Sequence, residues 1–408
     1  MKLSYEKINN IAKEYGESFY ILDTEQFKKN FNELLTAFRE IYSESYIAYS
    51  YKTNYTPRLC KIVDELGGYA EVVSDMEVEI ARRVGVKPER IIFNGPYKNQ
   101  AAVRDLLLDG GCVNIDSYDE FKYVKKIVEE NTDKKIHIGI RCNFEINDGV
   151  LSRFGIDVES KEFDEIVKWV NTSANVCMEE MHCHFAARSL KTWAPRAEKM
   201  IALTKEKFDN MPKHIDLGGG IFGKMADSLK AQFDDNIPEY KEYADVVATK
   251  FAQAFGEMNN RPKLFIEPGS ALVGDCMKFV CEVVSIKKVR NKPIATLLGS
   301  IYNINPTLNK KNPPISVYNK NEESEYFEDL DFGGFTCIES DYLYRHYDGK
   351  LAVGDYVMFG NVGSYSVVLK PPFILPNFPV IEIMEDDKIS VVKEKETFDD
   401  LFHTYSFE

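Results

Sequence analysis

Eight short apolar runs alternate with helix-like segments between residues 45 and 269, and this rhythm narrows the folds open to the chain. Runs rich in β-branched and aromatic residues predict strands, whereas apolar residues spaced three and four apart predict helices. Eight strands that each alternate with a helix are what a closed (β/α)8 TIM barrel requires. The strand-like runs are SYIAYSYK (45–52), AEVVS (70–74), IIFNG (91–95), CVNID (112–116), HIGIRCN (137–143), MEEMHCHF (178–185), HIDLGG (214–219) and LFIEPG (264–269).

The helix-like segments carry start signals of their own. Ser74 and Ser117 precede two of them and could cap their N-termini, with Glu77 and Glu120 in capping-box position. A doubly wound open sheet is the alternative fold for such an alternation. The number of strands and their nearly continuous apolar character favour the barrel, so we predict an α/β fold with a barrel domain at residues 26–270.

The rhythm changes after Gly269, where longer and partly alternating β runs follow one another without helix patterns between them. This arrangement predicts a second, mostly antiparallel β domain over residues 271–408. The run SFYILD (18–23) predicts a strand within residues 1–25 that joins this domain. The acidic stretch 321–331 is expected to form an exposed loop.

The composition is that of a globular protein, with 44% apolar and 28% charged residues among 408. A net charge of −14 argues against nucleic acid or an anionic membrane as a partner, since either would require a basic face. We find no signal-peptide pattern and no run of eighteen apolar residues, so we expect a cytoplasmic protein. The eight cysteines form no CxxC pair, which favours reduced thiols and no metal site.

Polar residues or glycines close all eight predicted strands, where a barrel of this kind carries its chemistry. Each has a structural interpretation by itself: Asp116 as a helix cap, Arg141 in a salt bridge, His184 as a core histidine. Because the carboxyl ends of barrel strands converge on one mouth, together they indicate a site. The residues are Lys52, Glu71 with Ser74, Asn94, Asp116, Arg141, His184, Gly218 to Gly220, and Glu267.

The segment DLGGGIFG after the seventh strand contains three consecutive glycines. Glycines let backbone N–H groups approach an anion, and the loops after strands seven and eight are the usual phosphate seat of such barrels. A tight turn explains a glycine triplet equally well. A phosphate seat beside a lysine and a carboxylate suggests pyridoxal 5'-phosphate (PLP), with Lys52 forming a Schiff base and Glu267 holding the ring nitrogen protonated.

Six motifs in register give the chain a resemblance to a known family. They are YSYKTN, HCHF, DLGGGI, EPG, GGFTC followed by Asp341, and GNVGSYS. In this order and at these separations they resemble the fold-type III PLP-dependent decarboxylases, which include diaminopimelate and ornithine decarboxylases and share the barrel of alanine racemase. The resemblance extends from about Phe19 to Leu401.

The resemblance implies roles for individual residues. Lys52 matches the Schiff-base lysine, His184 the histidine that stacks on the cofactor ring, and Glu267 the partner of the pyridine nitrogen. Glu71 stands where the family usually has an aspartate near the ring. Arg141 is added to the cofactor site on its position at a strand end. The remaining cofactor contacts implied are Gly218, Gly219, Gly220 and Tyr365.

For the substrate side the resemblance implies a shared site. Cys337 matches a cysteine that the neighbouring subunit contributes as an acid, and Asp341 an acidic position at the same interface. A homodimer with active sites formed across its interface is therefore implied. In the implied reaction an amino acid displaces Lys52, carbon dioxide leaves, the ring delocalises the carbanion, and Cys337 protonates Cα. A buried packing thiol is the alternative interpretation of Cys337.

The chain departs from the family pattern at positions that contact phosphate or substrate. Ser270 stands in place of the arginine of EPGR, and Ala187 stands in place of the serine of HxGS. Arg188 or Ser189 could supply the phosphate contact of that missing serine. Ile338 follows the cysteine where diaminopimelate enzymes have an acid. Asn305 and Asn309 stand where an arginine and a tyrosine are expected.

These departures bear on the substrate. A distal carboxylate is best held by a bidentate arginine, so the loss of two arginines argues against meso-diaminopimelate. We expect an α-amino acid with a basic, polyamine-like or conjugated tail, from a specialised biosynthetic pathway, received by Glu339 or Asp341.

Three other functions remain open from the sequence. An amino-acid racemase shares the barrel and the lysine, but racemases of this fold generally place an arginine at the pyridine nitrogen and use a tyrosine as second acid–base group. A catalytically silent PLP-binding homologue would tend to lose the lysine or the cysteine, which this chain keeps. A sugar-processing barrel with Glu71 and Glu267 as paired carboxylates leaves Lys52, the glycine loop and Cys337 unexplained.

Overall fold

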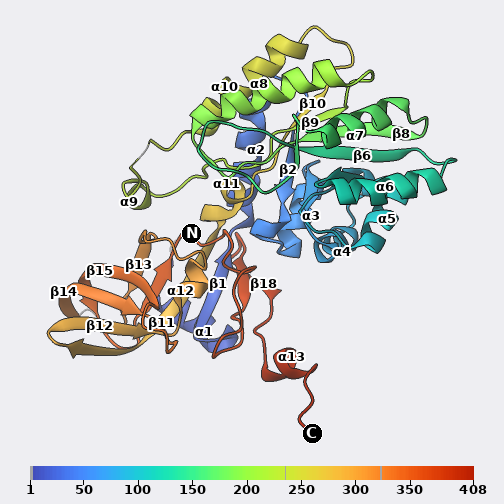
Figure 1. Cartoon of the computed structure of the whole chain (residues 1–408). Helices are drawn as coiled ribbons and strands as arrows, with labels where there is room; N and C mark the ends of the chain where they lie inside the picture. The colour runs from blue at the N-terminus through green and yellow to red at the C-terminus, as the bar shows by residue number, and fades with distance from the viewer. Residues whose placement is uncertain (1–2, 235, 322–323) are drawn as a thin grey trace. The chain divides into compact units, whose positions relative to one another are not determined.

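The computed structural model describes residues 3–234, 236–321 and 324–408 (Figure 1). The chain divides into two compact units. The barrel unit comprises Lys28–Phe222 and Ile237–Ala271, and the β unit comprises Met1–Phe27, Gly223–Asn236 and Leu272–Glu408. The segment 223–236, which the sequence analysis included in the barrel domain, thus groups with the β unit.

The barrel unit contains the eight predicted strands, and each neighbouring pair is parallel. Their order is β5-β4-β3-β2-β10-β9-β8-β6, and pairing of β5 with β6 closes the barrel. The predicted (β/α)8 barrel is confirmed. The strands are β2 (Ser45–Ser50), β3 (Tyr69–Val72), β4 (Ile91–Phe93), β5 (Cys112–Ile115), β6 (Ile136–Asn143), β8 (Val176–His182), β9 (His214–Asp216) and β10 (Lys263–Ile266), with the short β7 (Ile156–Asp157) beside β6.

Helices follow the strands as the apolar spacing predicts, and α8 and α10 lie side by side (Figure 1). The two predicted caps form, since Ser74 accepts a hydrogen bond from Glu77 N and Ser117 from Glu120 N, both at 3.2 Å. The helices of this part of the chain are α2 (Thr24–Arg39), η1 (Tyr51–Thr53), α3 (Pro57–Glu65), α4 (Asp75–Val84), η2 (Pro88–Arg90), α5 (Gln100–Leu108), α6 (Tyr118–Glu130), α7 (Lys161–Thr172), α8 (Leu190–Lys207), α10 (Tyr240–Phe255) and α11 (Ser270–Val273).

The β unit is built around β1 (Ser18–Leu22), which pairs antiparallel with β11 (Met277–Val289) and parallel with β17 (Val380–Ile383). The strand predicted at 18–23 thus pairs with two strands of this unit. Buried Phe19, Val280 and Ile381 form part of its core. The other elements are α1 (Tyr5–Tyr15), α9 (Asp227–Lys230), η3 (Gly274–Cys276), β12 (Lys292–Leu297), α12 (Ile301–Ile304), β13 (Ile315–Tyr318), β14 (Glu325–Gly333), β15 (Tyr342–Leu351), β16 (Tyr356–Phe359), β18 (Ile389–Lys393) and α13 (Phe398–Phe402).

One expectation for the β unit was wrong. The acidic stretch 321–331 was expected to be an exposed loop, but from Glu325 onward it belongs to β14, which pairs antiparallel with β15. Phe327 and Leu330 are buried, so their apolar contacts outweigh the charge of the neighbouring carboxylates. Residues 322–323 of this stretch lie outside the described part of the chain.

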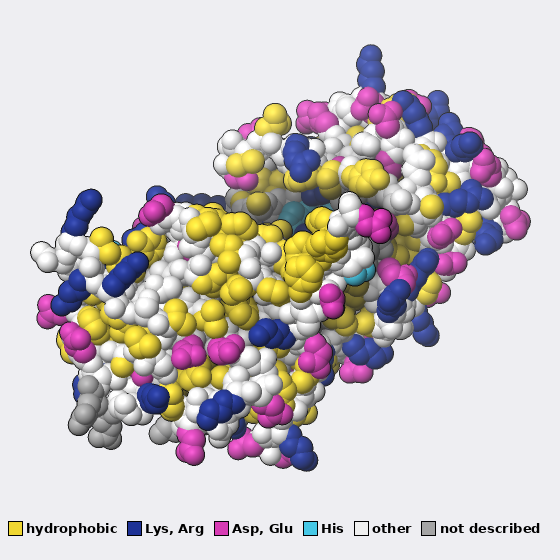
Figure 2. All heavy atoms as spheres, turned by 90° about the horizontal axis from the view of Figure 1, so that it is seen from below, with side chains coloured by type: hydrophobic (Ala, Val, Ile, Leu, Met, Phe, Trp, Pro, Cys, Tyr) yellow, Lys and Arg dark blue, Asp and Glu magenta, His cyan; other side chains and the backbone are white. Residues whose placement is uncertain are grey.

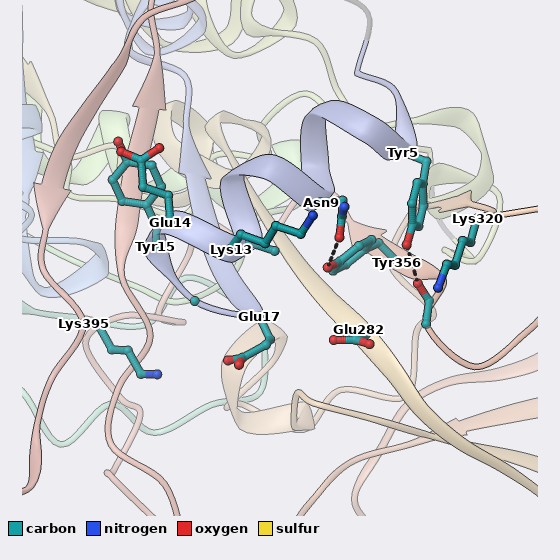
Figure 3. Close-up of a pocket in the computed structure, with 13 residues that line it drawn as sticks. Tyr5, Asn9, Lys13, Glu14, Tyr15, Glu17, Glu282, Lys320, Tyr356 and Lys395 are labelled. Carbon is teal, nitrogen blue, oxygen red and sulfur yellow. Dashed lines mark hydrogen bonds between the residues drawn. The ribbon is translucent and has the colours of Figure 1, made fainter.

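Figure 2 shows acidic and basic side chains scattered among one another on the face drawn, with hydrophobic side chains gathered near its middle. A cavity of about 520 Å³ lies in the β unit, lined by α1, β11 and neighbouring segments, with Glu17, Glu282, Lys13 and Lys395 around it (Figure 3). Among the residues described, no helix combines the length and the apolar character that crossing a membrane demands.

Candidate active site at the carboxyl ends of the barrel strands

Lys52 lies on the short 3-10 helix η1, which directly follows β2, and contacts a carboxylate of the neighbouring strand β3. Its Nζ donates to Glu71 at the end of β3 and lies 3.5 Å from Ser50 Oγ. Burial alone would lower the pKa of Lys52, but the charges of Glu71 and Glu267 outweigh it and raise the pKa above its usual value. The lysine therefore stands among two carboxylates at the barrel mouth.

Glu267 follows β10 and is almost completely buried, with 1% of its surface exposed. Its Oε1 accepts a hydrogen bond from Asn94 Nδ2 at 2.6 Å and lies 3.4 Å from His182 Nε2. Burial by itself would raise the pKa of this carboxyl, but His182 and Lys52 hold the pKa well below its usual value. Glu267 is thus an ionised carboxylate inside the barrel.

His184 stands between Glu267 and the glycine loop. Its Nδ1 lies 2.9 Å from the backbone N of Gly219 and 3.3 Å from Glu267 Oε2. Because a backbone N–H can only donate, Nδ1 accepts from Gly219 and a neutral ring carries its proton on Nε2. Burial lowers the pKa of His184 despite the nearby Glu267, which favours this neutral ring.

The three glycines after β9 leave no room for side chains. A Cβ at Gly218 would lie 2.5 Å from Cys183 O, at Gly219 2.7 Å from Glu267 O, and at Gly220 2.8 Å from Ala187 O. Gly218 and Gly220 also have positive φ angles of 70° and 95°. The loop is therefore a bare stretch of main chain at the barrel mouth, as a cradle for an anion requires.

Arg196 on α8 holds this loop from behind and was missed by the sequence analysis. Its guanidinium is fully buried and donates to Leu217 O at 3.0 Å and Gly219 O at 2.8 Å. It also donates to Phe185 O and Ala187 O, both at 3.3 Å. One cation thus ties the segment after β8 to the glycine loop. Its position in mid-helix gave no signal in the sequence.

Arg141 lies within β6, near its carboxyl end, and donates to Asp116 Oδ1 at 3.0 Å. Both side chains are buried, so the pair is a fixed cation–carboxylate contact within the barrel unit. The guanidinium also lies 4.7 Å from the ring centroid of Phe154. Arg141 therefore forms the salt bridge that was its structural interpretation from the sequence. Its contact with a cofactor stays a prediction.

The predicted residues of the β unit fall on two loops. Cys337 and Glu339 are exposed between β14 and β15, and Tyr365 is half-buried with a φ of 65°. The carboxylate of Asp341 is buried and accepts hydrogen bonds from Ser300 Oγ at 3.0 Å and Thr336 Oγ1 at 2.6 Å. Asp341 thus shapes the turn that carries Cys337.

Two groups of described residues bring possible metal ligands within 4.8 Å of one another. In the group of Asp329, Asp331 and His346, Lys292 already supplies a cation, 2.8 Å from Asp329 Oδ1. In the group of His182, Asp216 and Glu267, Glu267 accepts from Asn94. Burial and the nearby Glu267 raise the pKa of Asp216 well above its usual value, which favours a protonated carboxyl. Neither group fits a cation site well.

A lysine, a buried anionic carboxylate and a bare glycine loop are the parts that a PLP enzyme requires, and a family model decides the matter. Residues 26–274 match the pyridoxal binding domain of the pyridoxal-dependent decarboxylases, and this range exceeds half of the chain. The chain belongs to this family. Its cofactor is PLP, and its activity is that of a PLP-dependent amino-acid decarboxylase.

Individual decarboxylases resemble the chain over nearly its whole length. Diaminopimelate decarboxylase of Aquifex aeolicus is 22% identical over 96% of this chain and 92% of its own. The crystal structure of the Methanocaldococcus jannaschii diaminopimelate decarboxylase has a TM-score of 0.86 at 22% identity and covers 98% of this chain and 94% of its own. Lysine decarboxylase from Selenomonas ruminantium gives a TM-score of 0.77 at 20% identity over 95% and 97%.

Several residues around Lys52 and Glu267 carried too weak a signal in the sequence. Asn94 was recognised as a strand end, but its contact with both Glu71 and Glu267 was not foreseen. His182, the first histidine of HCHF, was passed over for the second. Glu77 was noted for its capping position alone, although it accepts from Val73 N at 2.7 Å and is buried near Glu71 and Lys52.

Replacing Arg196 with methionine tests the support of the glycine loop. The methionine keeps most of the side-chain volume but leaves buried carbonyls without their donors, so we expect the free energy of unfolding to fall by ~2–4 kcal/mol and PLP to bind more weakly. Urea unfolding and absorbance titration with PLP measure the two effects. The control is Lys199→Met on the same helix, which removes only a half-exposed lysine 3.9 Å from Glu159 and should change stability little. Equal behaviour of the two variants would contradict the assigned support.

The pH dependence of stability tests the buried Glu77. Burial raises its pKa to about 7. Its folded form therefore keeps a proton that the unfolded chain loses near pH 4.5, so its contribution to stability is full below about pH 4.5 and is lost as pH rises to about 7. Glu77→Gln should raise the free energy of unfolding at pH 8 by up to ~3 kcal/mol and change it little at pH 5. The exposed Glu79→Gln is the control, and a Glu77→Gln effect independent of pH would refute this assignment.

Proposed function

We propose that the chain decarboxylates an α-amino acid other than meso-diaminopimelate, with a basic, polyamine-like or conjugated tail, in a specialised biosynthetic pathway. The observation that carries this proposal is the replacement of charged substrate contacts by neutral ones. Ser270, Asn305 and Asn309 stand where the resembling diaminopimelate enzymes have an arginine, an arginine and a tyrosine. A distal carboxylate would lose its bidentate partner.

The local structure around the two asparagines supports this reading. Asn305 Nδ2 donates to Asn309 O at 2.8 Å, and Asn309 Nδ2 donates to Asn305 Oδ1 at 2.9 Å. Thr307 Oγ1 donates to the same Asn305 oxygen at 3.0 Å. These amides therefore satisfy one another and carry no charge of their own, and the two lysines of the same loop, Lys310 and Lys311, follow Asn309.

Glu339 supports a basic substrate tail. Its side chain is exposed on the turn that carries Cys337, two residues away. Asp341 is committed to holding this turn, because its buried oxygens accept from Ser300, Ile301 and Thr336. Of the two acids predicted to meet the substrate, we therefore assign Glu339 to the distal ammonium and Asp341 to the position of the turn.

The residues of the barrel unit fit PLP, since a cradle without Cβ atoms, an amine and a buried anion are all present. When bound, PLP supplies an electron sink for the charge left by carbon dioxide. In this proposal Lys52 supplies the amine that holds the aldehyde carbon, and Glu267 keeps a proton on the ring nitrogen. His184 would pack on the ring, and the loop of Gly218 to Gly220, in which the N–H groups of Gly218 and Gly219 donate to Asp216 and His184, would receive the phosphate. Tyr365 stays a predicted phosphate contact, and Arg141 would stabilise the cofactor site through its charge.

On the substrate side, we assign proton delivery to Cα to the Cys337 thiol of a second copy of the chain. Exposure of Cys337 supports this role, because an acid offered to a neighbouring subunit must lie at the surface of its own. Exposed apolar side chains near Tyr365 support a homodimer, since Leu369, Phe373 and Ile374 are 55%, 42% and 52% exposed. The finished sites would then contain residues from both copies.

A substrate panel tests the proposed specificity. The chain with PLP is incubated with lysine, ornithine, conjugated polyamine precursors and meso-diaminopimelate, and release of carbon dioxide is followed by mass spectrometry. We expect turnover of an acid with a basic or conjugated tail, and Glu339→Gln should raise its KM more than it lowers kcat because a charged contact is lost. Robust turnover of meso-diaminopimelate alone would overturn the proposal.

Mixing two inactive variants tests the shared site. Lys52→Ala and Cys337→Ala should each lower kcat by about 10²-fold or more, as expected for loss of a nucleophile or a general acid. If each site takes Lys52 from one copy and Cys337 from the other, mixed dimers contain one intact site, and a refolded equimolar mixture should recover about a quarter of the activity. Cys177→Ala, which changes a half-buried thiol, serves as the control. No recovery in a mixture that forms dimers would place both residues in one copy.

A further inference from the structure

The interior of the barrel below Glu267 contains a column of polar side chains where branched apolar residues usually pack. Asn94 after β4, Asn114 on β5 and Glu180 on β8 are 2%, 1% and 0% exposed. His214 on β9 is also buried, with Nδ1 3.6 Å from Glu180 Oε2. Such burial is costly for polar groups, so these side chains need a reason beyond filling space.

Hydrogen bonds connect this column to the site. Asn114 Nδ2 donates to Glu180 Oε1 at 2.5 Å and to Asn94 Oδ1 at 2.7 Å. Asn94 Nδ2 in turn donates to Glu267 Oε1 at 2.6 Å and to Glu71 Oε1 at 3.2 Å. Three successive side chains therefore connect the middle of the barrel to the two carboxylates beside Lys52.

The direction of donation along the column depends on which atom of the Asn114 amide faces Glu180. Glu180 Oε1 accepts from Asn114 Nδ2, so the amide nitrogen of Asn114 faces Glu180. The same nitrogen then donates to the Asn94 oxygen, and this leaves the Asn94 nitrogen facing Glu71 and Glu267. If Asn94 turned over, its carbonyl oxygen would face these two carboxylates, and acceptors would oppose acceptors.

The space around Asn114 supports this orientation. Its Oδ1 is buried and has no hydrogen-bond partner in the part of the chain that the structure describes, so the amide is held through its nitrogen. Gly139 on β6 makes room for it, because a Cβ there would lie 1.7 Å from Asn114 Oδ1. The barrel thus contains a glycine where this amide oxygen lies.

We propose that Glu180 is a positioning residue that acts through Asn114 to keep Asn94 donating to Glu267 and Glu71. This inference rests on the proposed function, in which Glu267 is the partner of the ring nitrogen. A donor facing Glu267 favours its charged form, and a charged Glu267 keeps the proton on the ring. Glu180 itself contacts neither substrate nor cofactor.

The test compares two isosteric changes on one strand, Glu180→Gln and Glu179→Gln, in the holoenzyme. Glu179 contacts His137, Lys213 and the far nitrogen of His214 but none of the asparagines, so it is the matched control for the link through Asn114. A glutamine at 180 can present either its oxygen or its nitrogen to Asn114, so the column loses its fixed direction. The measurement is the nitrogen-15 signal of ring-labelled PLP against pH, which reports the protonation of the ring nitrogen.

We expect the ring nitrogen of Glu180→Gln to lose its proton at a pH about one unit lower than in the unchanged enzyme, which is a tenfold weaker hold on the proton. kcat should fall about tenfold with little change in KM, and Glu179→Gln should match the unchanged enzyme. If Glu180→Gln titrates like the unchanged enzyme, the inference is overturned.

A second variant keeps the inference testable if Glu180→Gln does not fold. Asn114→Ala removes the donor to Asn94 and leaves Glu180 in place, so it should cause the same shift in titration. An unshifted titration in a folded Asn114→Ala enzyme overturns the inference. If the unchanged enzyme binds PLP but its ring nitrogen is unprotonated at neutral pH, the role proposed for Glu267 fails, and the inference that rests on it fails as well.

Discussion

A buried carboxylate that stays ionised is the constraint on which the site depends. Glu267 is 1% exposed, and burial acts against its charge, yet Asn94, His182 and Lys52 surround it. Each of these groups comes from a different strand or strand end, so the closed barrel is what brings them together. The barrel is therefore the element that keeps a negative charge where water cannot reach it.

The sequence predicted the fold well because its signals are local. The eight apolar runs, and the helix caps at Ser74 and Ser117, depend on neighbours in the chain. The structure contains all eight strands and both caps. The strand-end residues were also predictable, since parallel strands bring their carboxyl ends to one rim. The prediction of an exposed loop at 321–331 was wrong because the charged residues concealed the apolar pattern of Phe327 and Leu330, which are buried in β14.

The remaining parts of the site could not be predicted, because they depend on contacts between distant segments. Arg196 lies in mid-helix and Asn114 and Glu180 lie inside strands, where a polar residue usually signals an outward face. Only the closed barrel shows that Asn114 and Glu180 point inward and meet. Similarly, Asp341 resembled a substrate contact until its two hydrogen bonds from Thr336 in the turn and two from the start of α12 were known.

The glycine loop has a consequence for how the site can change over evolutionary time. Its shape is enforced by main-chain crowding at Gly218, Gly219 and Gly220, and by the carbonyls that Arg196 gathers. The proposed anion seat is therefore shaped by main chain, and the N–H groups of Gly218 and Gly219 donate to Asp216 and His184. Under that proposal, side chains around the seat such as Ala187 and Ser270 can vary between lineages, whereas a single added methyl group at one of the three glycines would collide with the carbonyls around the loop.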